Sequence, residues 1–313
     1  MTVASETPSN LINSVPPRPR RRRSSVGVGS ADLLMPPWLS RIVLLLLVVA
    51  VIVPVGYMLL LSLTPNQNVV FGSISLAALE VRNYIDIWSQ APIAAGLIHT
   101  LIIAGSAATA SVIVGLLAAY PLTRFTFAGR RPYLYTLIAV QTVPGTTLIL
   151  PLFAVLSWIQ TTLGVNFIGT YYPIIITYMT FGVPLSTWLL VAYMRTVPRD
   201  LDEAALVDGC SRLGALRRVI FPIALPAIVV AFVFAFLVGW NDVLFASVFT
   251  NSNNQTLAIA LQRFASDTST AALPLYGELM AAAVVSSVPV VALYLVFQRY
   301  LVHGLSAGSL TGM

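Results

Sequence analysis

Long apolar runs, separated by short polar segments, fill most of the chain after residue 36. They lie at about 40–63, 95–120, 133–157, 171–194, 222–246 and 279–301. A helix needs about 20 apolar residues to cross a bilayer, so each run is long enough to span the membrane. The pattern therefore predicts an all-α, polytopic membrane protein with six transmembrane helices.

Several of these runs contain proline, and the residues are Pro54, Pro144, Pro151, Pro184 and Pro289. Membrane helices tolerate proline when neighbouring helices satisfy the freed backbone groups, so an ordinary kink and a hinge are both compatible with each one. Between the spans, the segments at about 64–94 and 247–278 are long enough to form short helices at the membrane surface. The stretch "NYIDIWSQ" (83–90) is amphipathic enough for such a helix.

The first 36 residues differ from the rest of the chain. They are rich in Pro, Ser and Arg, as in "PPRPRRRRSS" (16–25), and show no apolar period, so a disordered cytoplasmic tail is expected ahead of a transmembrane domain over 37–313. The first apolar run exceeds the core of a signal peptide, which has about 7–15 residues, and is expected to remain as an anchor. An Arg run can bind nucleic acid, but a role in membrane orientation is the simpler interpretation, and no nucleic-acid partner is expected.

The arginines indicate the orientation in the membrane. With six spans and the tail inside, both termini are cytoplasmic, and every arginine except Arg82 and Arg263 falls on the cytoplasmic side. The opposite orientation would invert this bias and break the positive-inside rule. The segment between the fourth and fifth spans is therefore predicted to lie in the cytoplasm.

The composition agrees with a membrane protein and narrows its chemistry. Hydrophobic residues make up 58% and charged residues 9%, whereas soluble domains carry about 25% charged residues. All 17 basic residues are Arg, so no lysine is present for a phosphate-binding Walker loop. Cys210 is the single cysteine, and His99 and His303 lie far apart, so neither a disulfide nor a metal site is expected. Without paired acids or a His/Cys cluster, no catalytic residue and no directly bound cofactor is expected.

One internal segment, "DLDEAALVDGCSRLGALRRVIFPIALP" (200–226), is unusually charged for this chain. Its acids come early and its arginines late, which suits the dipole of a helix. Thr196–Pro198 is expected to open that helix, and Asp200 with Glu203 resembles a capping box. Gly209 permits a turn, so the segment predicts two short helices joined at this glycine.

The two short helices would each carry a narrow apolar face. The first face holds Leu201, Ala204 and Ala205, and the second holds Leu213, Leu216 and Val219 or Ile220. A helix pair of this kind in the cytoplasm suits a groove on a partner protein. Packing on its own bundle or on the membrane surface is the alternative, and the spacing leaves both open.

The stretch "EAALVDGCSRLGALRRVIFP" (203–222) resembles the EAA motif of ABC importer permeases, E-A-A-x3-G-x9-I-x-L-P. The matching residues are Glu203, Ala204, Ala205, Asp208, Gly209 and Pro222, whereas Val219 and Phe221 replace the usual Ile and Leu. Five further segments are similar to the carbohydrate branch of this family, of the maltose-permease type: "AAYPLTRFTFAGRR" (118–131), "VPGTTLILPLF" (143–153), "GWNDVLFA" (239–246), "TLAIALQRF" (256–264) and "LMAAAVVSSVPVVALYLVFQRYLVHGLSAGSL" (279–310).

This resemblance implies a type I ABC importer permease in the bacterial cytoplasmic (inner) membrane. Such a chain forms half of a translocation path with a second, homologous permease, together with two ATPase subunits that use the ATP and an extracellular substrate-binding (lipo)protein. The EAA loop, about 196–221, would be the coupling helix, with Glu203 as a polar anchor toward the ATPase and Ala204 and Ala205 allowing close approach. The implied substrate is a sugar, from mono- to oligosaccharide, or a glycerol phosphate.

Four polar residues are candidates for lining the translocation path. Asn241 and Asp242 lie near the outer end of the fifth span, and Gln141 and Thr142 lie in the third. Polar groups in a membrane tend to face a cavity or a partner, so path lining and hydrogen bonding between helices are both open. The competing function is a stand-alone secondary transporter or channel. It would need an ion-coupling carboxylate near mid-membrane, whereas Asp242 and Glu278 are expected near outer ends.

Overall fold

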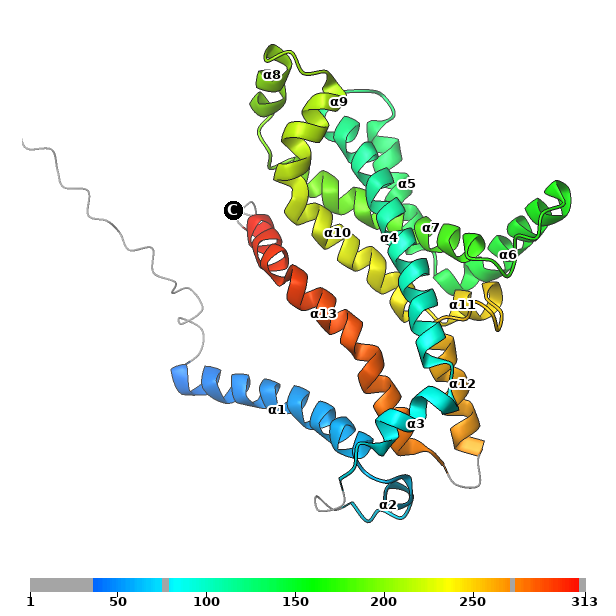
Figure 1. Ribbon diagram of the computed structural model, residues 1–313. Coiled ribbons are helices and arrows are strands. Elements are labelled where there is room, and N and C mark those ends of the chain that lie inside the picture. The colour runs from blue at the N-terminus through cyan, green and yellow to red at the C-terminus, as the bar shows by residue number, and fades with distance from the viewer. Residues whose placement is uncertain (1–35, 75–78, 271–273, 310–313) are drawn as a thin grey trace, which may run out of the picture. The chain divides into compact units, whose positions relative to one another are not determined.

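The computed structural model describes the backbone of residues 36–74, 79–270 and 274–309, and the regular structure in these ranges is helical throughout. The predicted all-α fold is confirmed (Figure 1). Of the predicted N-terminal tail, residues 1–35 lie outside the described ranges. The helices are α1 (Pro37–Ser62), α2 (Asn66–Val70), α3 (Arg82–Gln90), α4 (Ile93–Arg124), α5 (Arg130–Thr142), α6 (Gly145–Leu163), α7 (Tyr172–Met194), α8 (Asp200–Val207), α9 (Arg212–Ala215), the π-helical turn η2 (Leu216–Ile220), α10 (Phe221–Asn241), α11 (Leu244–Phe249), α12 (Leu257–Thr270) and α13 (Tyr276–Ser309).

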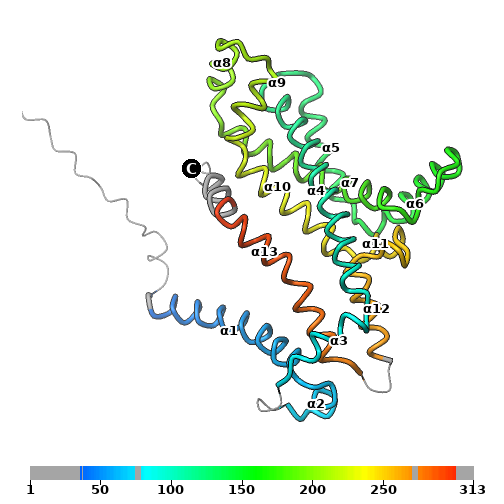
Figure 2. Tube along the Cα trace, in the orientation of Figure 1, coloured from blue at the N-terminus to red at the C-terminus, as the bar shows by residue number. Residues whose placement is uncertain are grey.

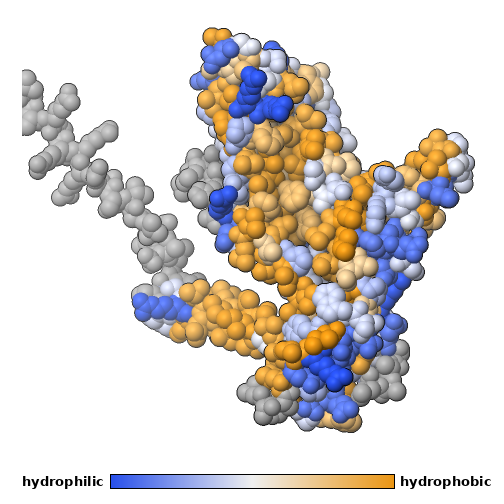
Figure 3. All heavy atoms as spheres, viewed as in Figure 1, coloured by the Kyte–Doolittle hydropathy of each residue, from blue (hydrophilic) through white to orange (hydrophobic). Residues whose placement is uncertain are grey.

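Within the described part of the chain, six helical stretches are long and apolar enough to cross a membrane, as predicted. They are Trp38–Ser62, Ile93–Arg124, Gly145–Leu163, Tyr172–Met194, Arg212–Asn241 and Tyr276–Tyr300. Hydrophobic residues cover much of the visible face between more hydrophilic ends of the larger part of the molecule (Figure 3). This distribution suits a bundle whose middle lies in lipid.

The chain divides into two compact units, residues 1–55 and 56–313. Helix α1 begins in the first unit and ends in the second. It is almost entirely apolar apart from Arg41 near its start, and side chains on several sides, such as Leu45 and Val51, are exposed. A helix that is apolar all round is typical of a membrane span.

The third predicted span, 133–157, is wrong as a single helix. The chain forms two helices there, α5 and α6, with a break at Val143 and Pro144 (Figure 2). Val143 is extended, with φ −75° and ψ 124°, because a following proline disfavours the helical conformation. Pro144 therefore starts α6 and does not kink a helix. The other four prolines named above do lie inside helices, as predicted: Pro54, Pro151, Pro184 and Pro289.

The fifth predicted span, 222–246, also ends earlier than expected. Helix α10 stops at Asn241, and Asp242 is extended, with φ −76° and ψ 130°. A separate short helix, α11, follows from Leu244. The apolar run continues through this break, so hydropathy alone does not reveal it.

Helices α4 and α7 pack closely and in parallel. A methyl group on Gly115 would lie 3.0 Å from Cβ of Ser186, and one on Gly182 would lie 3.0 Å from Cβ of Ser111. Small residues spaced four apart allow two membrane helices to approach in this way. Ser111 faces Gly182, and Gly115 faces Ser186. A step of four residues along α4 therefore matches a step of four residues forward along α7, so both helices run in the same direction. The chain between them, α5 with α6, therefore crosses the membrane once.

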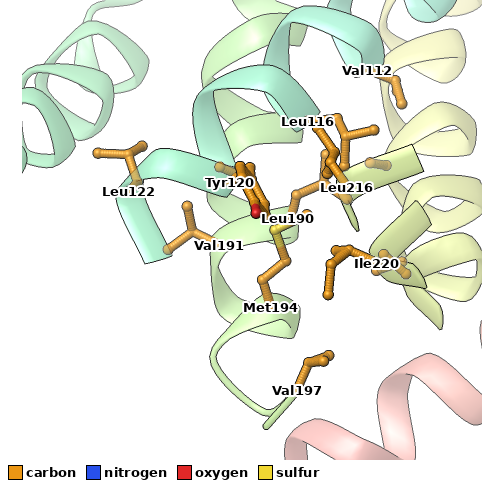
Figure 4. Packing of buried hydrophobic residues seen from close by; sticks show 14 residues of the cluster. Val112, Leu116, Tyr120, Leu122, Leu190, Val191, Met194, Val197, Leu216 and Ile220 are labelled. Atoms are coloured by element: carbon orange, nitrogen blue, oxygen red, sulfur yellow. The ribbon is translucent and has the colours of Figure 1, made fainter. Parts of the chain in front are cut away.

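A buried apolar cluster joins α4, α7 and the start of α10 at one end of the bundle (Figure 4). It includes Leu116 and Tyr120 of α4, Leu190 and Met194 of α7, and Ile220 of η2, all less than a tenth exposed. Large apolar side chains at this density hold the three helices in one arrangement. The segment from residue 199 to residue 215 emerges from this end.

Helices α2 and α3 and the start of α13 lie at the opposite end of the second unit (Figure 1), and polar side chains hold them together. Asn66 of α2 donates from Nδ2 to Oε1 of Glu278 at 3.0 Å, and its Oδ1 accepts from the Gly277 amide at 2.8 Å. Asn83 of α3 donates to the Thr64 carbonyl at 2.9 Å. The short helices expected in the segment 64–94 are thus present as α2 and α3, and they are fastened to the start of α13.

Candidate functional site: the hairpin between α7 and α10

Residues 199–215 form a helical hairpin of α8 and α9, which projects at one end of the second unit (Figure 1). We refer to it as the α8–α9 hairpin. It contains most of the charged segment that the sequence singles out, and it leads through η2 directly into α10.

The start of the hairpin differs from the sequence prediction. Helix α8 begins at Asp200, after Pro198, and Arg199 at its N-cap already has helical dihedral angles and forms no side-chain cap. Asp200 and Glu203 both lie inside the helix, so the predicted capping box is wrong. The acidic side chains of the first turn still lie at the positive end of the helix dipole, and this attraction stabilises the start of α8.

The predicted turn at Gly209 is confirmed. Gly209 has a φ of 84°, a conformation that glycine adopts without strain. The amide of Gly209 donates to the Leu206 carbonyl at 3.1 Å, and the amide of Cys210 donates to the Ala205 carbonyl at 3.0 Å. Ser211 then caps α9, because its Oγ accepts from the Gly214 amide at 3.1 Å, a cap that the sequence reading missed although Ser is typical there.

The motif residues of the hairpin divide between an exposed and a buried side. Glu203, Ala204 and Asp208 are exposed, whereas Ala205 is only 5% exposed and packs inside the hairpin. Ala204 and Ala205 therefore do not share one exposed face. Ala205 serves the internal packing of the hairpin, whereas Ala204 leaves a small side chain at the surface.

The exposed side of the hairpin is also apolar in places. Val207 is 87% and Leu213 69% exposed, and Leu201 and Leu206 are exposed to lesser degrees. Large apolar side chains gathered at a hydrophilic end of a protein are typical of an interaction surface. The hairpin therefore exposes apolar side chains on both of its helices together with the carboxylate of Glu203.

Pro222, the last motif residue, lies in the first turn of α10 and is exposed. Proline cannot donate a hydrogen bond to the carbonyl four residues earlier. The wider π-helical turn η2 directly precedes it, and such turns change the hydrogen-bonding pattern locally. The hairpin is thereby joined to a membrane helix without a flexible linker.

A buried ion pair, absent from the sequence prediction, fixes the hairpin to α4. Nε of Arg124 lies 2.8 Å from Oδ2 of Asp202, and the two side chains are 7% and 11% exposed. Nη1 of Arg124 also donates to the Val197 carbonyl at 3.1 Å, and Tyr120 lies beside Asp202. Arg124 is visible in the sequence as an arginine ending the second span, but no local pattern identifies its partner.

Asp242, one of the four path candidates, is engaged in the fold. Its Oδ2 accepts from the Tyr178 hydroxyl at 2.9 Å and from the Ala246 amide at 2.9 Å. It thus links α10 to α7 and caps α11. The geometry therefore favours hydrogen bonding between helices for Asp242, and Tyr178 is the partner that sequence reasoning missed.

The other path candidates are exposed. Asn241 donates to the Leu237 carbonyl at 2.9 Å and borders an open groove of about 280 Å³ that Trp240 and Ser286 also line. Gln141 and Thr142 form the end of α5 beside the break before α6.

The start of α6 comes close to α11. A methyl group on Gly145, the first residue of α6, would lie 3.5 Å from the Phe245 ring. Because Gln141 and Thr142 lie just before α6 and Asp242 just before α11, the two groups of candidates belong to adjoining segments.

A family model for the inner membrane component of binding-protein-dependent transport systems matches residues 111–307. This range covers more than half of the chain and includes the hairpin. The chain belongs to this family of ABC importer permeases.

Individual relatives of this permease are also transport proteins. It is 34% identical over 237 residues to the sulfoquinovosyl glycerol transport system permease protein of Agrobacterium fabrum, covering 75% of this chain and 79% of that one. It is 31% identical over 262 residues to the trehalose transport system permease protein of Mycobacterium tuberculosis, covering 83% and 93%.

The fold of the permease matches a solved structure from a bacterial ABC transporter for the acidic polysaccharide alginate. The TM-score is 0.69 at 18% identity, covering 88% of this chain and 99% of that one. At this identity the likeness concerns the fold, which is that of an ABC importer permease.

In the described part of the permease, no group of three or more His, Cys, Asp or Glu side chains is placed to hold a metal ion. His99, for example, contacts the Gln255 carbonyl through Nδ1 at 3.2 Å.

Proposed function

We propose that this permease is one membrane subunit of an ATP-driven sugar importer in a bacterial cytoplasmic membrane. It would form half of the translocation path with a second, homologous permease. The observation that carries the proposal is the α8–α9 hairpin, which offers an exposed carboxylate and exposed apolar side chains while its base is held by a buried ion pair. The relatives named for sulfoquinovosyl glycerol and trehalose transport support a sugar as the substrate.

The hairpin would seat in a cleft of an ATPase subunit. Glu203 would meet a polar or basic group there, Ala204 would allow close approach, and Leu213 and Val207 would fill apolar pockets. Buried apolar anchors with a polar neighbour supply most of the binding energy in such contacts. The chain lacks lysine and hence a Walker loop, so ATP would be bound and used by two ATPase subunits and not by this chain.

On the other side of the membrane, an extracellular substrate-binding (lipo)protein would deliver the sugar. A bacterial alginate transporter of the same fold has been seen with its pentasaccharide-bound periplasmic protein, which supports a partner of this kind. The arginine distribution supports a cytoplasmic position for the hairpin and both termini.

Reversing the charge of Glu203 tests the docking. The Glu203→Arg variant should reach the membrane normally but retain the ATPase about tenfold less well on purification, equivalent to about 1.4 kcal/mol. Uptake in liposomes that hold the reconstituted complex should fall in parallel. Glu80→Arg, the same substitution beyond the opposite end of the bundle, is the matched control and should retain the ATPase.

Two outcomes would contradict the proposal. One is unchanged ATPase retention and uptake in the Glu203→Arg complex. The other is sugar uptake by liposomes that contain this chain alone and an imposed ion gradient, because that result belongs to a secondary transporter.

A further inference from the structure

Three side chains of the α8–α9 hairpin meet three consecutive residues at the end of α4. Arg199 donates from Nη2 to the Thr123 carbonyl at 3.0 Å. Asp202 pairs with Arg124 at 2.8 Å. The guanidinium of Arg212 lies 4.8 Å from the centre of the Phe125 ring, a cation–π distance.

The three contacts reach both arms of the hairpin. Arg199 precedes α8, Asp202 lies within α8, and Arg212 begins α9. A tilt or rotation of the hairpin relative to α4 would break at least one of them. The hairpin and the end of α4 are therefore held as one body and not joined by the backbone alone.

Arg124 extends this body to α7. Its Nη1 donates to the carbonyls of Met194 at 3.4 Å and Val197 at 3.1 Å, where α7 ends and the chain turns toward the hairpin. Farther along, α4 and α7 are in close contact at Gly115 and Gly182. A displacement of Asp202 would therefore be passed to two parallel membrane helices.

The burial of the pair indicates a geometric role. Desolvation of two charges offsets most of their attraction, so a buried ion pair is weak evidence for a gain in stability. With the side chains of Arg124 and Asp202 only 7% and 11% exposed, however, any arrangement that separates them leaves a charge without a partner. The pair thus penalises every hairpin orientation except the one observed.

We propose that Arg124 and Asp202 are positioning residues that transmit the movement of the hairpin to α4 and α7. This inference rests on the proposed function, since it takes the ATPase to be what moves the hairpin. It differs from docking because neither side chain is exposed to a partner. Loss of the pair should leave the ATPase bound while its movement is no longer passed on.

The test compares Asp202→Asn with Asp200→Asn in the reconstituted complex. Asp200 is an exposed acid in the first turn of the same helix, so it matches the substitution without touching the pair. The Asp202→Asn complex should keep its ATPase subunits and hydrolyse ATP, but the sugar imported per ATP should fall about fivefold, within the range of coupling effects known for single residues. The Asp200→Asn complex should keep the normal ratio, and Asp202→Glu should recover part of it.

The result separates this inference from the docking proposal. If Asp202→Asn keeps the normal ratio of import to hydrolysis, or loses the ATPase as Glu203→Arg is expected to do, the positioning role is overturned while docking can still stand. If Glu203→Arg has no effect, docking itself fails. Should Asp202→Asn not accumulate in the membrane, Arg124→Gln carries the test from the other side of the pair, and a normal ratio in that variant would overturn the positioning role.

Discussion

Asp242 illustrates how a single polar side chain organises three helices. Its Oδ2 accepts from the Tyr178 hydroxyl and the Ala246 amide, each at 2.9 Å. Tyr178 is only 2% exposed, and Gly239 leaves room for its ring, since a methyl group there would lie 2.8 Å from it. The Tyr178 hydroxyl is therefore held in position to donate to this carboxylate.

Removing that hydroxyl should weaken the bundle. Tyr178→Phe leaves Asp242 with one donor fewer in a buried setting, which should cost about 1 kcal/mol of unfolding free energy. Thermal unfolding of the purified protein in detergent measures the change. Tyr172→Phe is the matched control, because Tyr172 is 65% exposed, and equal effects of the two substitutions would refute the assigned role.

At this scale, the sequence revealed single residues but few of their partners. Asp242, Glu203 and Gly209 stand out by charge, motif or backbone freedom, and the turn at Gly209 was predicted correctly. The partners Tyr178 and Arg124 come from helices distant along the chain. Spacing within one element carries no information about such contacts.

Among the elements, α4 and α7 pack closely because glycines lie at their contact. A methyl group added to Gly115 or Gly182 would lie only 3.0 Å from Cβ of a serine on the other helix. Membrane helices gain little from apolar surface alone, because lipid is as apolar as they are, so close approach is what favours one partner.

A large side chain at Gly115 should separate the pair. Gly115→Leu is expected to destabilise the protein by about 1–3 kcal/mol, as overpacking of a tight interior does. Gly105→Leu on the same helix is the control, because a Cβ atom there meets no atom within 4 Å. Resistance to heat or proteolysis in detergent should fall for the first variant alone, and a similar fall in both would argue against the close contact.

Element boundaries were harder to predict than element number. The length of each apolar run predicts a membrane span, and this is why the number of spans was predictable. The same length does not distinguish one continuous helix from two helices in series. At Pro144 and Asp242 a helix ends and another begins, although the apolar run continues on both sides of each residue. Proline at 144 was recognised, yet a break and a kink have the same signature in the sequence.

For the whole molecule, the orientation in the membrane decides which surfaces meet partners on each side. The arginine bias predicts that the hairpin is inside and the segment 247–278 outside. Helices α4 and α7 run in the same direction. The chain between them, α5 and α6, must therefore return to the side of the membrane on which α4 began, and the predicted six-span topology requires the same. Both the hairpin and the segment 247–278 offer exposed positions for labelling.

Single cysteines should report this orientation. In a Cys210→Ser background, an impermeant thiol reagent added to intact cells should label an Asn253→Cys variant but not a Leu213→Cys variant. Leu213 and Asn253 are both exposed, so access from one side decides the outcome. Permeabilised cells serve as the control, where both variants should react, and labelling of Leu213→Cys in intact cells would contradict the orientation.

The break between α5 and α6 has a consequence for what surrounds the permease. Residues 141–144 are all exposed, and the Val143 amide reaches the Val140 carbonyl only at 3.4 Å. Hydrocarbon tails cannot hydrogen-bond a loosened backbone, so irregular chain at membrane depth persists only beside water or another polypeptide. If residues 141–144 lie within the hydrocarbon layer, they therefore require water or another polypeptide beside them.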